Sequence, residues 1–310
     1  MKTNYDVLGL GCTAVDDILY VPAYPAPDTK VEVRQRERHC GGLTATALVA
    51  AVRMGARAAF AGTLGDDEHS RFVMETMERE GIHTRHVVRR KGAGPIRSVI
   101  VVDETRRTRN IFYDTTGGLG AHPKLPAREI IQSARVLLVD RFGIPGMIRA
   151  ARVARAADIP VVGDFESSHL PRFGELLALV DHLILSESFA RKITGRPSAR
   201  AAARALCLAD RRAVVITCGA KGCWYLQPGM ASAKHLPAFR VEAVDTTGCG
   251  DVFHGAYAAA LARGASLQER LHVASTAAAL KATQHGGQAG IPSRHKVASF
   301  LSARRSVLED

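Results

Sequence analysis

Hydrophobic and polar positions follow a regular pattern over the second half of the chain. Short apolar runs, which predict buried strands, take turns with longer amphipathic stretches, which predict helices. The strand-like runs are 135–140, 159–164, 182–185, 213–218 and 223–226, and the helix-like stretches are 145–157, 173–180, 187–194 and 198–209. Strands that alternate with helices pair in parallel and carry helices on both faces of the sheet. This half of the chain therefore predicts a three-layer α/β/α core with a mostly parallel sheet.

The first half of the chain follows the same pattern with two interruptions. Its core elements are predicted as strands at 5–11 and 57–62 and helices at 43–54 and 68–80. The interruptions are alternating segments that predict further strands at 17–21, 30–38, 97–102 and 108–113. They fall within residues 12–38 and 96–114, which we expect to form a small accessory sheet beside the core. We interpret residues 1–310 as one domain into which these two segments are inserted.

The composition is that of an ordinary soluble globular protein, with 46% hydrophobic and 23% charged residues. No apolar run approaches the ~20 residues that a membrane-spanning helix needs, and the N-terminus enters strand-like sequence without the apolar stretch of a signal peptide. The six cysteines are scattered and form no CxxC pair, which indicates reduced thiols rather than disulfides or a zinc site. We expect a cytoplasmic protein with no membrane partner.

The formal net charge of +12 raises nucleic acid as a possible class of partner. Two features argue against it. The basic residues are spread along the whole chain, and aromatic residues, which would stack on bases, make up only 5%. We therefore expect no nucleic-acid partner. An anionic small molecule such as ATP or a sugar phosphate accounts for part of the positive charge.

The strongest local signal for chemistry is the segment 244-VDTTGCGDVFHGAYAAALARG-264. A strand-like approach at Phe239–Val244 leads into a turn rich in threonine and glycine. A long alanine-rich helix follows from about residue 250 to residue 263. The sequence therefore predicts that a tight turn opens directly into the N-terminus of a long helix.

The first residues of this helix combine two properties. The small residues Gly248, Cys249 and Gly250 let backbone N–H groups converge where the helix N-terminus favours phosphate oxygens. Asp251, in the first helical turn, can accept a proton from a substrate hydroxyl, so the base and the charge stabilisation that phosphoryl transfer requires lie together. The alternative is a plain turn followed by a helix-start aspartate that the dipole favours. The residues by themselves leave both interpretations open.

The sequence DTTGCGD at 245–251 resembles the C-terminal signature of the PfkB/ribokinase-like carbohydrate kinases, whose usual form is DTxGAGD. The resemblance covers the whole chain, because further motifs follow in order. They are the Gly-x-x-x-x-Asp of 11–16, the glycine pair at 41–42, the turn TCGAKG at 217–222 and the tail GGQAGIP at 286–292. The fold that the resemblance implies is a ribokinase-like α/β/α core with a small β-sheet lid built from residues 12–38 and 96–114.

The resemblance also implies a role for each matching residue. Asp251 is the base, and Gly248, Cys249 and Gly250 form the anion hole for the γ-phosphate of ATP. Residues expected around the sugar are Asp16, Gly41, Gly42 and Thr46, and those expected around the nucleotide are Thr217, Gly219, Gly222, Ser186 and Gly287. Asp245 and Thr247 lie where many relatives hold a monovalent cation, so K⁺ joins ATP and Mg²⁺ as a candidate cofactor. The lid is expected to join two copies of the chain as a homodimer.

The sequence departs from the family pattern at the magnesium-associated Asn-x-x-Glu motif. This motif reads Ser186-Glu187-Ser188-Phe189 here. We expect Mg²⁺ to be held mostly by ATP and water, with Glu187 or Asp164 assisting from a greater distance.

A second departure concerns the sugar. The substrate asparagine expected shortly after the glycine pair is Thr46, which argues against ribose-type recognition. Thr46, the unusual His254, the Ser186 segment and residues 280–292 look most like the sulfofructose kinase and ketohexokinase branches of the family.

Two cations suit an anionic group on the substrate. Lys30 is predicted on a lid strand, where a flexible ammonium can meet a phosphate or a sulfonate, the alternative being a solvated strand lysine. Arg141 follows the run 135–140 at the carboxyl edge of the sheet, where α/β proteins bind ligands, the alternative being a surface ion pair. Asp140 and Asp164 end strands at the same edge and either contact the substrate or cap the next segment.

Three functions follow from these observations. The first is an ATP-dependent kinase for a ketose-like sugar, with or without a phosphate or sulfonate group. The second is a nucleoside or ribose kinase of the same fold. The third is a ligand-binding relative without catalysis, which only the altered motif at 186–189 supports; the retained Asp251 and anion turn argue against it.

Overall fold

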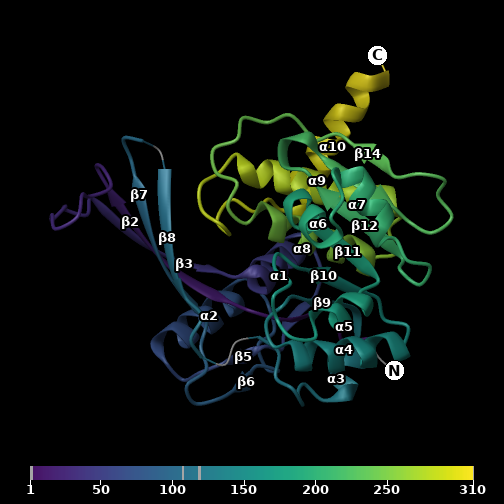
Figure 1. Cartoon of the computed structure of the whole chain (residues 1–310), viewed down its shortest axis with the longest axis horizontal. Helices are drawn as coiled ribbons and strands as arrows, with labels where there is room; N and C mark the ends of the chain where they lie inside the picture. Colours follow the sequence, from purple (N-terminus) through teal and green to yellow (C-terminus); the bar gives the residue numbers. More distant parts are fainter. Residues whose placement is uncertain (1–2, 107, 118–119, 310) are drawn as a thin grey trace.

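The computed structural model contains an eight-stranded central sheet that crosses the molecule (Figure 1). The structure describes residues 3–106, 108–117 and 120–309, with side chains of the last helix up to Arg304. In spatial order the strands are β14 (Lys234–Leu236), β13 (Cys223–Leu226), β12 (Ala213–Thr217), β11 (His182–Ser186), β10 (Val161–Asp164), β9 (Ala134–Val139), β1 (Tyr5–Leu10) and β4 (Ala58–Phe60). The strands from β12 to β4 are parallel, and β13 and β14 are antiparallel additions at one edge. The mostly parallel sheet that the sequence predicts is confirmed.

Helices cover both faces of this sheet. One face packs against α1 (Leu43–Arg53), α2 (Glu68–Arg79), α8 (Cys249–Ala262), α9 (Leu267–Ala282) and α10 (Arg294–Glu309). The other packs against α3 (Arg128–Gln132), α4 (Ile144–Ala156), α5 (Phe173–Ala178), α6 (Glu187–Thr194) and α7 (Ala199–Leu206). Strand β9 shows why its sequence is continuously apolar, since Val136 and Leu138 enter one core and Leu137 and Val139 the other. The three-layer α/β/α arrangement is thereby confirmed.

A separate four-stranded sheet, the lid, projects from one side of the core (Figure 1). Its order is β3 (Gln35–Gly41), β2 (Ala14–Val21), β7 (Ile96–Asp103) and β8 (Thr108–Asp114). Strands β2 and β7 pair in parallel, and the two outer pairs are antiparallel. The two segments that interrupt the α/β pattern do form one accessory sheet, as expected; residue 107, inside the second segment, lies outside the described residues. A short parallel pair, β5 (Thr63–Leu64) and β6 (Val88–Arg89), completes the strands.

The strand predicted at 30–38 is wrong in its first part. Strand β3 begins only at Gln35, and Lys30 lies in an exposed loop rather than on a lid strand. The register between β2 and β3 explains the difference. Gln35 pairs with Tyr20, so each residue before Gln35 would have to pair with a residue equally far beyond Tyr20. Residues 30 and 33 would then face Pro25 and Pro22, which have no N–H to complete a ladder.

The strand predicted at Phe239–Val244 is also wrong, because this segment has no regular structure. Its end is held by a helix instead of a strand: the N–H groups of Val244 and Asp245 both donate to the carbonyl of Ala282, at the end of α9, at 2.7 and 3.0 Å. Its beginning packs Phe239 against Phe300 of α10. The segment therefore serves to carry the chain to the start of α8. Among the described helices, none has the length and apolar character needed to cross a membrane.

Candidate active site

The parallel strands and helix α8 meet at the carboxyl edge of the central sheet. Because β1, β9, β10 and β11 run in the same direction, their last residues lie side by side there. Helix α8 starts at this edge after Gly248, whose φ of 74° is in the left-handed region that glycine adopts at least cost. No side chain caps the helix. Its first N–H groups are therefore suited to an anionic ligand.

Asp251, in the first turn of α8, lies among other carboxylates. Burial raises the pKa of Asp251 well above its ordinary value, and the charges of Asp164, Glu166 and Asp140 raise it further. Lys281 acts in the opposite direction. A carboxyl group in such an environment is a stronger base than a solvated aspartate, as proton abstraction from a hydroxyl requires.

Asp164 and His254 connect α8 to the strand ends. His254 is buried, and its Nδ1 lies 2.8 Å from the carbonyl oxygen of Gly250 while its Nε2 lies 3.0 Å from that of Ile184. The Oδ2 of Asp164 lies 3.3 Å from His254 Nδ1, but this buried oxygen accepts no hydrogen bond from the described residues. His254 thus packs between the first turn of α8 and strand β11.

Asp140 directly follows β9 and holds the neighbouring backbone in place. It is fully buried, and it accepts hydrogen bonds from Cys12 N at 2.7 Å, Thr44 Oγ1 at 2.9 Å and Phe142 N at 2.8 Å. Burial raises the pKa of Asp140 to about 6. A Cβ at Gly11 would lie 2.1 Å from the Asp140 carboxylate, so this position excludes larger residues. Of the two roles open for Asp140, the structure favours support of the adjacent segments.

The structure brings the residues expected around the sugar together where β2, β3 and α1 meet. Ala14 of β2 pairs with Gly41, and a Cβ on Gly41 would lie 2.6 Å from Asp16 Oδ2. Burial raises the pKa of Asp16, with a hydrogen bond from Ser98 acting against it. Gly42 has a φ of 94° and lies against the backbone of Thr13, so a side chain there would collide with it. These residues form one continuous wall leading from the lid to α1.

Thr46 continues this wall toward the anion turn. It is buried in α1, and a Cβ on Gly248 would lie 3.4 Å from its methyl group. Its Oγ1 accepts a hydrogen bond from Gln288 Nε2 at 3.3 Å. The predicted sugar side and the predicted phosphate side of the site are therefore in contact.

Of the residues expected around the nucleotide, Ser186, Thr217, Gly219 and Gly222 lie at or just after the carboxyl ends of β11 and β12, whereas Gly287 lies in the segment after α9, beside Gly248. Ser186 pairs in register with Thr217, and its hydroxyl caps α6 by accepting from Phe189 N at 3.3 Å. Glu187 points toward Cys218. Burial raises the pKa of the Cys218 thiol to about 11, and the negative charge of Glu187 contributes to this increase. Phe189 is buried against Phe173, which explains why no carboxylate occupies that position of the motif.

The turn that follows β12 requires glycine at two positions because of backbone conformation and lack of space. Gly219 and Gly222 have φ angles of 57° and 95°. A Cβ on Gly222 would lie 2.0 Å from the carbonyl oxygen of Leu236, so only glycine fits there. This turn at the end of β12 is an exposed backbone ledge next to the Ser186 segment.

Asp245 connects the anion turn to the segment that follows α9. Its Oδ1 accepts from Thr247 N at 2.9 Å, and its Oδ2 accepts from Gly286 N at 3.0 Å. Burial acts to raise its pKa, but the hydrogen bonds from Thr247 and the charge of Lys281 hold the pKa of Asp245 below its usual range. Gly287 lies on the far side, with its carbonyl oxygen 3.1 Å from where a Gly248 Cβ would be. The anion turn is thus enclosed by its own carboxylate and by the 286–288 segment.

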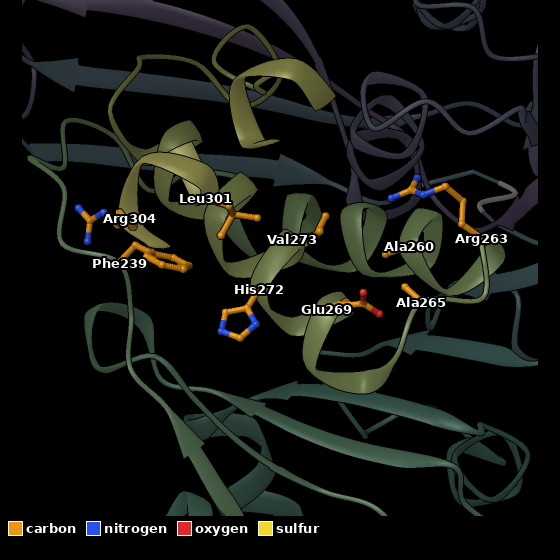
Figure 2. Close-up of a pocket in the computed structure, with 9 residues that line it drawn as sticks. All are labelled: Phe239, Ala260, Arg263, Ala265, Glu269, His272, Val273, Leu301 and Arg304. Atoms are coloured by element: carbon orange, nitrogen blue, oxygen red, sulfur yellow. The ribbon is translucent and has the colours of Figure 1, made fainter. Parts of the chain in front are cut away.

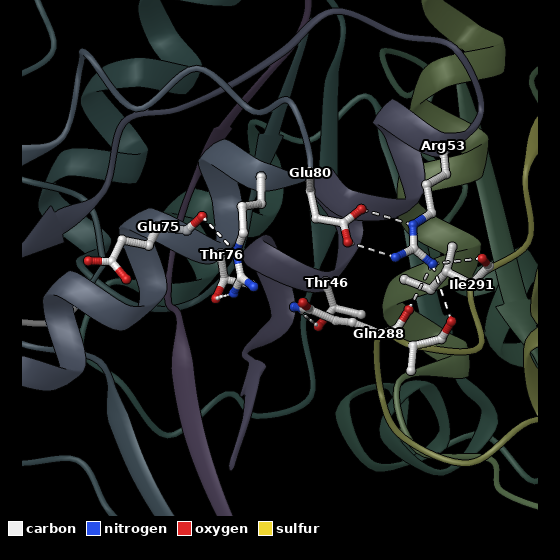
Figure 3. Close-up of polar contacts among 9 residues, drawn as sticks. Thr46, Arg53, Glu75, Thr76, Glu80, Gln288 and Ile291 are labelled. Carbon is white, nitrogen blue, oxygen red and sulfur yellow. Dashed lines mark hydrogen bonds and ion pairs between the residues drawn. The ribbon is translucent and has the colours of Figure 1, made fainter. Parts of the chain in front are cut away.

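The segment after α9 is in turn fixed to α1 (Figure 3). The guanidinium of Arg53 donates to both carboxylate oxygens of Glu80, at 2.7 and 2.9 Å, and also to the carbonyl oxygens of Gln288 and Ile291, at 3.1 and 2.8 Å. Together with the bond between Gln288 and Thr46, these contacts hold the segment beside Gly248.

Of the two predicted anion-binding cations, only Arg141 lies in a confined position. Lys30 is exposed in its loop. The Arg141 side chain is 16% exposed, and its guanidinium stacks 4.3 Å from the centre of the Phe142 ring. Among the described residues, its guanidinium forms one ion pair, 3.6 Å long, with the exposed Glu166, and its buried Nε has no hydrogen-bond partner. Arg141 therefore has unused donor capacity at the carboxyl edge of the sheet.

A cavity in the same molecule lies away from this edge (Figure 2). It is lined by Ala260 and Arg263 at the far end of α8, by His272 of α9, and by Leu301 and others from α10. Ala260 is nine residues beyond Asp251, which along a helix is about 13 Å. The cavity is therefore separate from Asp251, the predicted base.

The sequence reasoning did not assign a role to two residues that shape the site, Arg53 and Lys281. Arg53 lies in α1, and Lys281 is completely buried near the end of α9, where its Nζ donates to the carbonyl oxygen of Asp245 at 2.8 Å. A lysine within the apolar run AAALKA at 277–282 was the available signal.

A family model described as pfkB family carbohydrate kinase matches residues 6–294. A ribokinase from Haemophilus influenzae is 28% identical over 301 residues, covering 94% of this chain and 97% of that protein. The crystal structure of a ribokinase from Thermotoga maritima is 25% identical with a TM-score of 0.83, covering 96% and 99% of the two chains. The structure of an Arabidopsis thaliana ribokinase complexed with ribose and ATP has a TM-score of 0.84 at 23% identity over 97% and 99%, which supports the fold.

Proposed function

The chain belongs to the pfkB family of carbohydrate kinases, and from this premise we propose that it transfers the γ-phosphate of ATP to a hydroxyl of a ketose-like, anionic sugar with Asp251 as the base. The observation that carries the assignment of Asp251 is its position in the first turn of an uncapped helix, among carboxylates that raise its pKa. The base and the phosphate-binding N–H groups then belong to one helical turn.

In the proposed reaction the sugar hydroxyl attacks the γ-phosphorus in line with the leaving oxygen of ADP. Asp251 accepts the hydroxyl proton as the new P–O bond forms and the bond to ADP breaks. The N–H groups at the start of α8 stabilise the negative charge on the transferring group. The lid covers the sugar side and excludes water, which would otherwise compete as acceptor.

The residues of this site would hold Mg²⁺ through few direct protein contacts. Among the described residues, no group of three or more metal-ligating side chains is present. The buried Oδ2 of Asp164, which accepts no hydrogen bond there, is available toward the cation that accompanies ATP. Mg²⁺, when bound, neutralises the phosphate charge. We propose that ATP and water supply most of its ligands, and that Glu187, turned toward Cys218, is less suited than Asp164.

The anionic sugar is proposed because of Arg141 and Thr46. A confined guanidinium with a free N–H favours a phosphate or sulfonate group on the substrate. Thr46 stands where ribose-type relatives are expected to carry asparagine, and its hydroxyl is already engaged by Gln288. Ribose is the second candidate, because the relatives compared above are ribokinases.

Turnover of MgATP with a panel of sugars tests both parts of the proposal. The panel contains fructose, fructose phosphates, sulfofructose, tagatose phosphate, ribose and adenosine, and ADP release is followed. We expect one anionic ketose to be turned over, and Asp251→Asn to lower kcat by about 100-fold or more. Asp158→Asn, an exposed aspartate at the other end of β10, is the matched control and should keep full activity. Unchanged turnover in Asp251→Asn would exclude it as the base.

The variant Arg141→Met distinguishes the two sugars. Loss of a charged hydrogen bond, worth about 1.5–3 kcal/mol, should raise KM for an anionic ketose about 10- to 100-fold. KM for ribose should hardly change. Equal effects on both sugars, or turnover of ribose alone, would contradict the anionic substrate and favour ribose.

We further propose that two copies of the chain pair through the lid. Strand β8 is an edge strand that is exposed along its length, and it presents Ile111, Phe112 and Tyr113 together with Val99 of β7. An edge strand with this many exposed apolar side chains is a favourable surface for pairing.

A further inference from the structure

Lys281 carries a positive charge into the interior beside the anion turn. Its side chain is 0% exposed, and its Nζ donates to the backbone carbonyl of Asp245 at 2.8 Å and lies 3.8 Å from Asp245 Oδ2. Burying an ammonium is costly unless it is paired. The oxygens of Asp245 supply that pairing, and the C-terminal end of α9 favours a cation as well.

The same aspartate determines where the anion turn lies. One of its carboxylate oxygens holds Thr247, immediately before Gly248, and the other holds Gly286, immediately before Gly287. Lys281 balances the charge of this carboxylate from the Oδ2 side, inside the protein, and Arg109 of the lid approaches Oδ1 at 3.5 Å from outside. The position of the turn therefore depends on a fixed positive charge next to Asp245.

The resemblance drawn from the sequence implies a monovalent cation at Asp245 and Thr247, and the residues present do not fit one. K⁺ prefers carbonyl and carboxylate oxygens, as an ammonium does. Here the Asp245 carbonyl and carboxylate already face the Lys281 ammonium. A second cation bound to the same oxygens would be repelled by it at a distance of a few ångströms.

We propose that the Lys281 ammonium replaces the monovalent cation, so that the anion turn is held in place without K⁺. Lys281 is a positioning residue in this arrangement, because both its hydrogen bond and its ion pair are made with Asp245. The proposed role of Lys281 rests on the proposed kinase function wherever turnover is the measurement. The measurements of Tm described below do not depend on that function.

The test compares wild type with Lys281→Ala, which removes the charge and leaves space for an ion. Turnover and Tm are measured in potassium chloride and in choline chloride at equal ionic strength. We expect wild type to show the same kcat and Tm in both salts. In choline, Lys281→Ala should lose about 100-fold in kcat, comparable to losing one oxyanion-hole donor. Potassium should restore most of this loss and raise the Tm of this variant alone.

Two further variants separate charge from packing. Lys281→Met removes the charge but fills the space, so it should lose activity without rescue by K⁺. Lys296→Met, at an exposed position of α10, controls for loss of a positive charge and should behave as wild type in both salts. Stimulation of wild type by K⁺ would overturn the proposal, as would a Lys281→Ala variant on which K⁺ has no effect in either measurement. If no sugar is turned over at all, the kinase proposal fails, and the Tm comparison still decides the role of Lys281.

Discussion

Asp251 is surrounded mainly by groups of its own charge. Asp164, Glu166 and Asp140 all act to raise its pKa, beyond the effect of burial, and Lys281 opposes them. Asp164 is the last residue of β10, and Asp140 directly follows β9. Acidic residues at the ends of neighbouring parallel strands thus add to the effect of burial in making this carboxyl group more basic.

This environment predicts the acid limb of the pH–rate profile. Only ionised Asp251 accepts a proton, and its pKa is raised, so kcat/KM should fall with decreasing pH well above the ordinary aspartate value of 3.8. Asp164→Asn removes the largest like-charge contribution and should move the limb to lower pH. A limb that stays in place in this variant would contradict the assigned cause.

The sequence identified some residues of the site and missed others for a physical reason. Gly248, Gly250 and Asp251 are neighbours in the chain, so a motif describes them. Lys281 and Arg53 act through backbone carbonyl oxygens that lie 36 and 235 or more residues away. A carbonyl oxygen is present at every residue, so the sequence offers no sign of which one a lysine or an arginine meets.

Helices α1 and α8 pack closely enough that one position excludes a methyl group. A Cβ at Gly255 would lie 1.9 Å from the carbonyl oxygen of Ala47. Helix α1 begins after Gly42 and carries Thr46, while α8 carries Asp251. The contact at Gly255 therefore helps to set the distance between the sugar side of the site and the base.

Gly255→Ala should separate these helices. We expect a loss of stability of about 1–3 kcal/mol from overpacking, together with a lower kcat, because the base moves away from the sugar. The matched control is Gly174→Ala in α5, where nothing lies within 4 Å of the added Cβ and stability should rise by about 0.4–1 kcal/mol. Urea unfolding and steady-state kinetics measure both effects, and a Gly255→Ala protein as stable and active as wild type would refute the close packing.

At the level of elements, the apolar pattern predicted the central strands well and misjudged segments whose partner is not a strand. Residues 136–140 and 213–216 are buried on both faces, and this shows in their sequence. Residues 30–34 alternate in the same way as a strand but would face a proline-rich turn, and residues 239–244 are held by the end of α9. Alternation describes a segment, whereas a ladder also requires a partner with free N–H groups.

The whole molecule consists of a core that carries the chemistry and a lid that extends beyond it (Figure 1). The sequence predicted this division in two ways. Two strand-like segments interrupt the α/β pattern, and the family resemblance, which covers the whole chain, implies a lid beside the core. The edge of the lid presents apolar side chains to solvent, among them Tyr113, which is 70% exposed.

Pairing through the lid predicts a dimer in solution that a charge on β8 disrupts. Phe112→Glu should convert the protein to a monomer, because a carboxylate would be buried against apolar side chains of the partner copy. Tyr24→Glu, at an exposed position in the loop after β2, is the control and should remain dimeric. Sedimentation velocity distinguishes the two, and a monomeric wild type would rule out the dimer.

The two sides of the active site come from distant parts of the chain. Gly42 and Asp251 are separated by the lid hairpin and most of the central sheet. During translation at about 5–20 residues per second, the base is made roughly 10–40 s after the sugar wall. Through this interval α1 has no α8 to cover its alanine- and leucine-rich face, so the nascent chain presents a surface suited to chaperones. With Asp251 as the proposed base, this nascent chain also cannot yet transfer phosphate from ATP, because α8 is among the last elements to leave the ribosome.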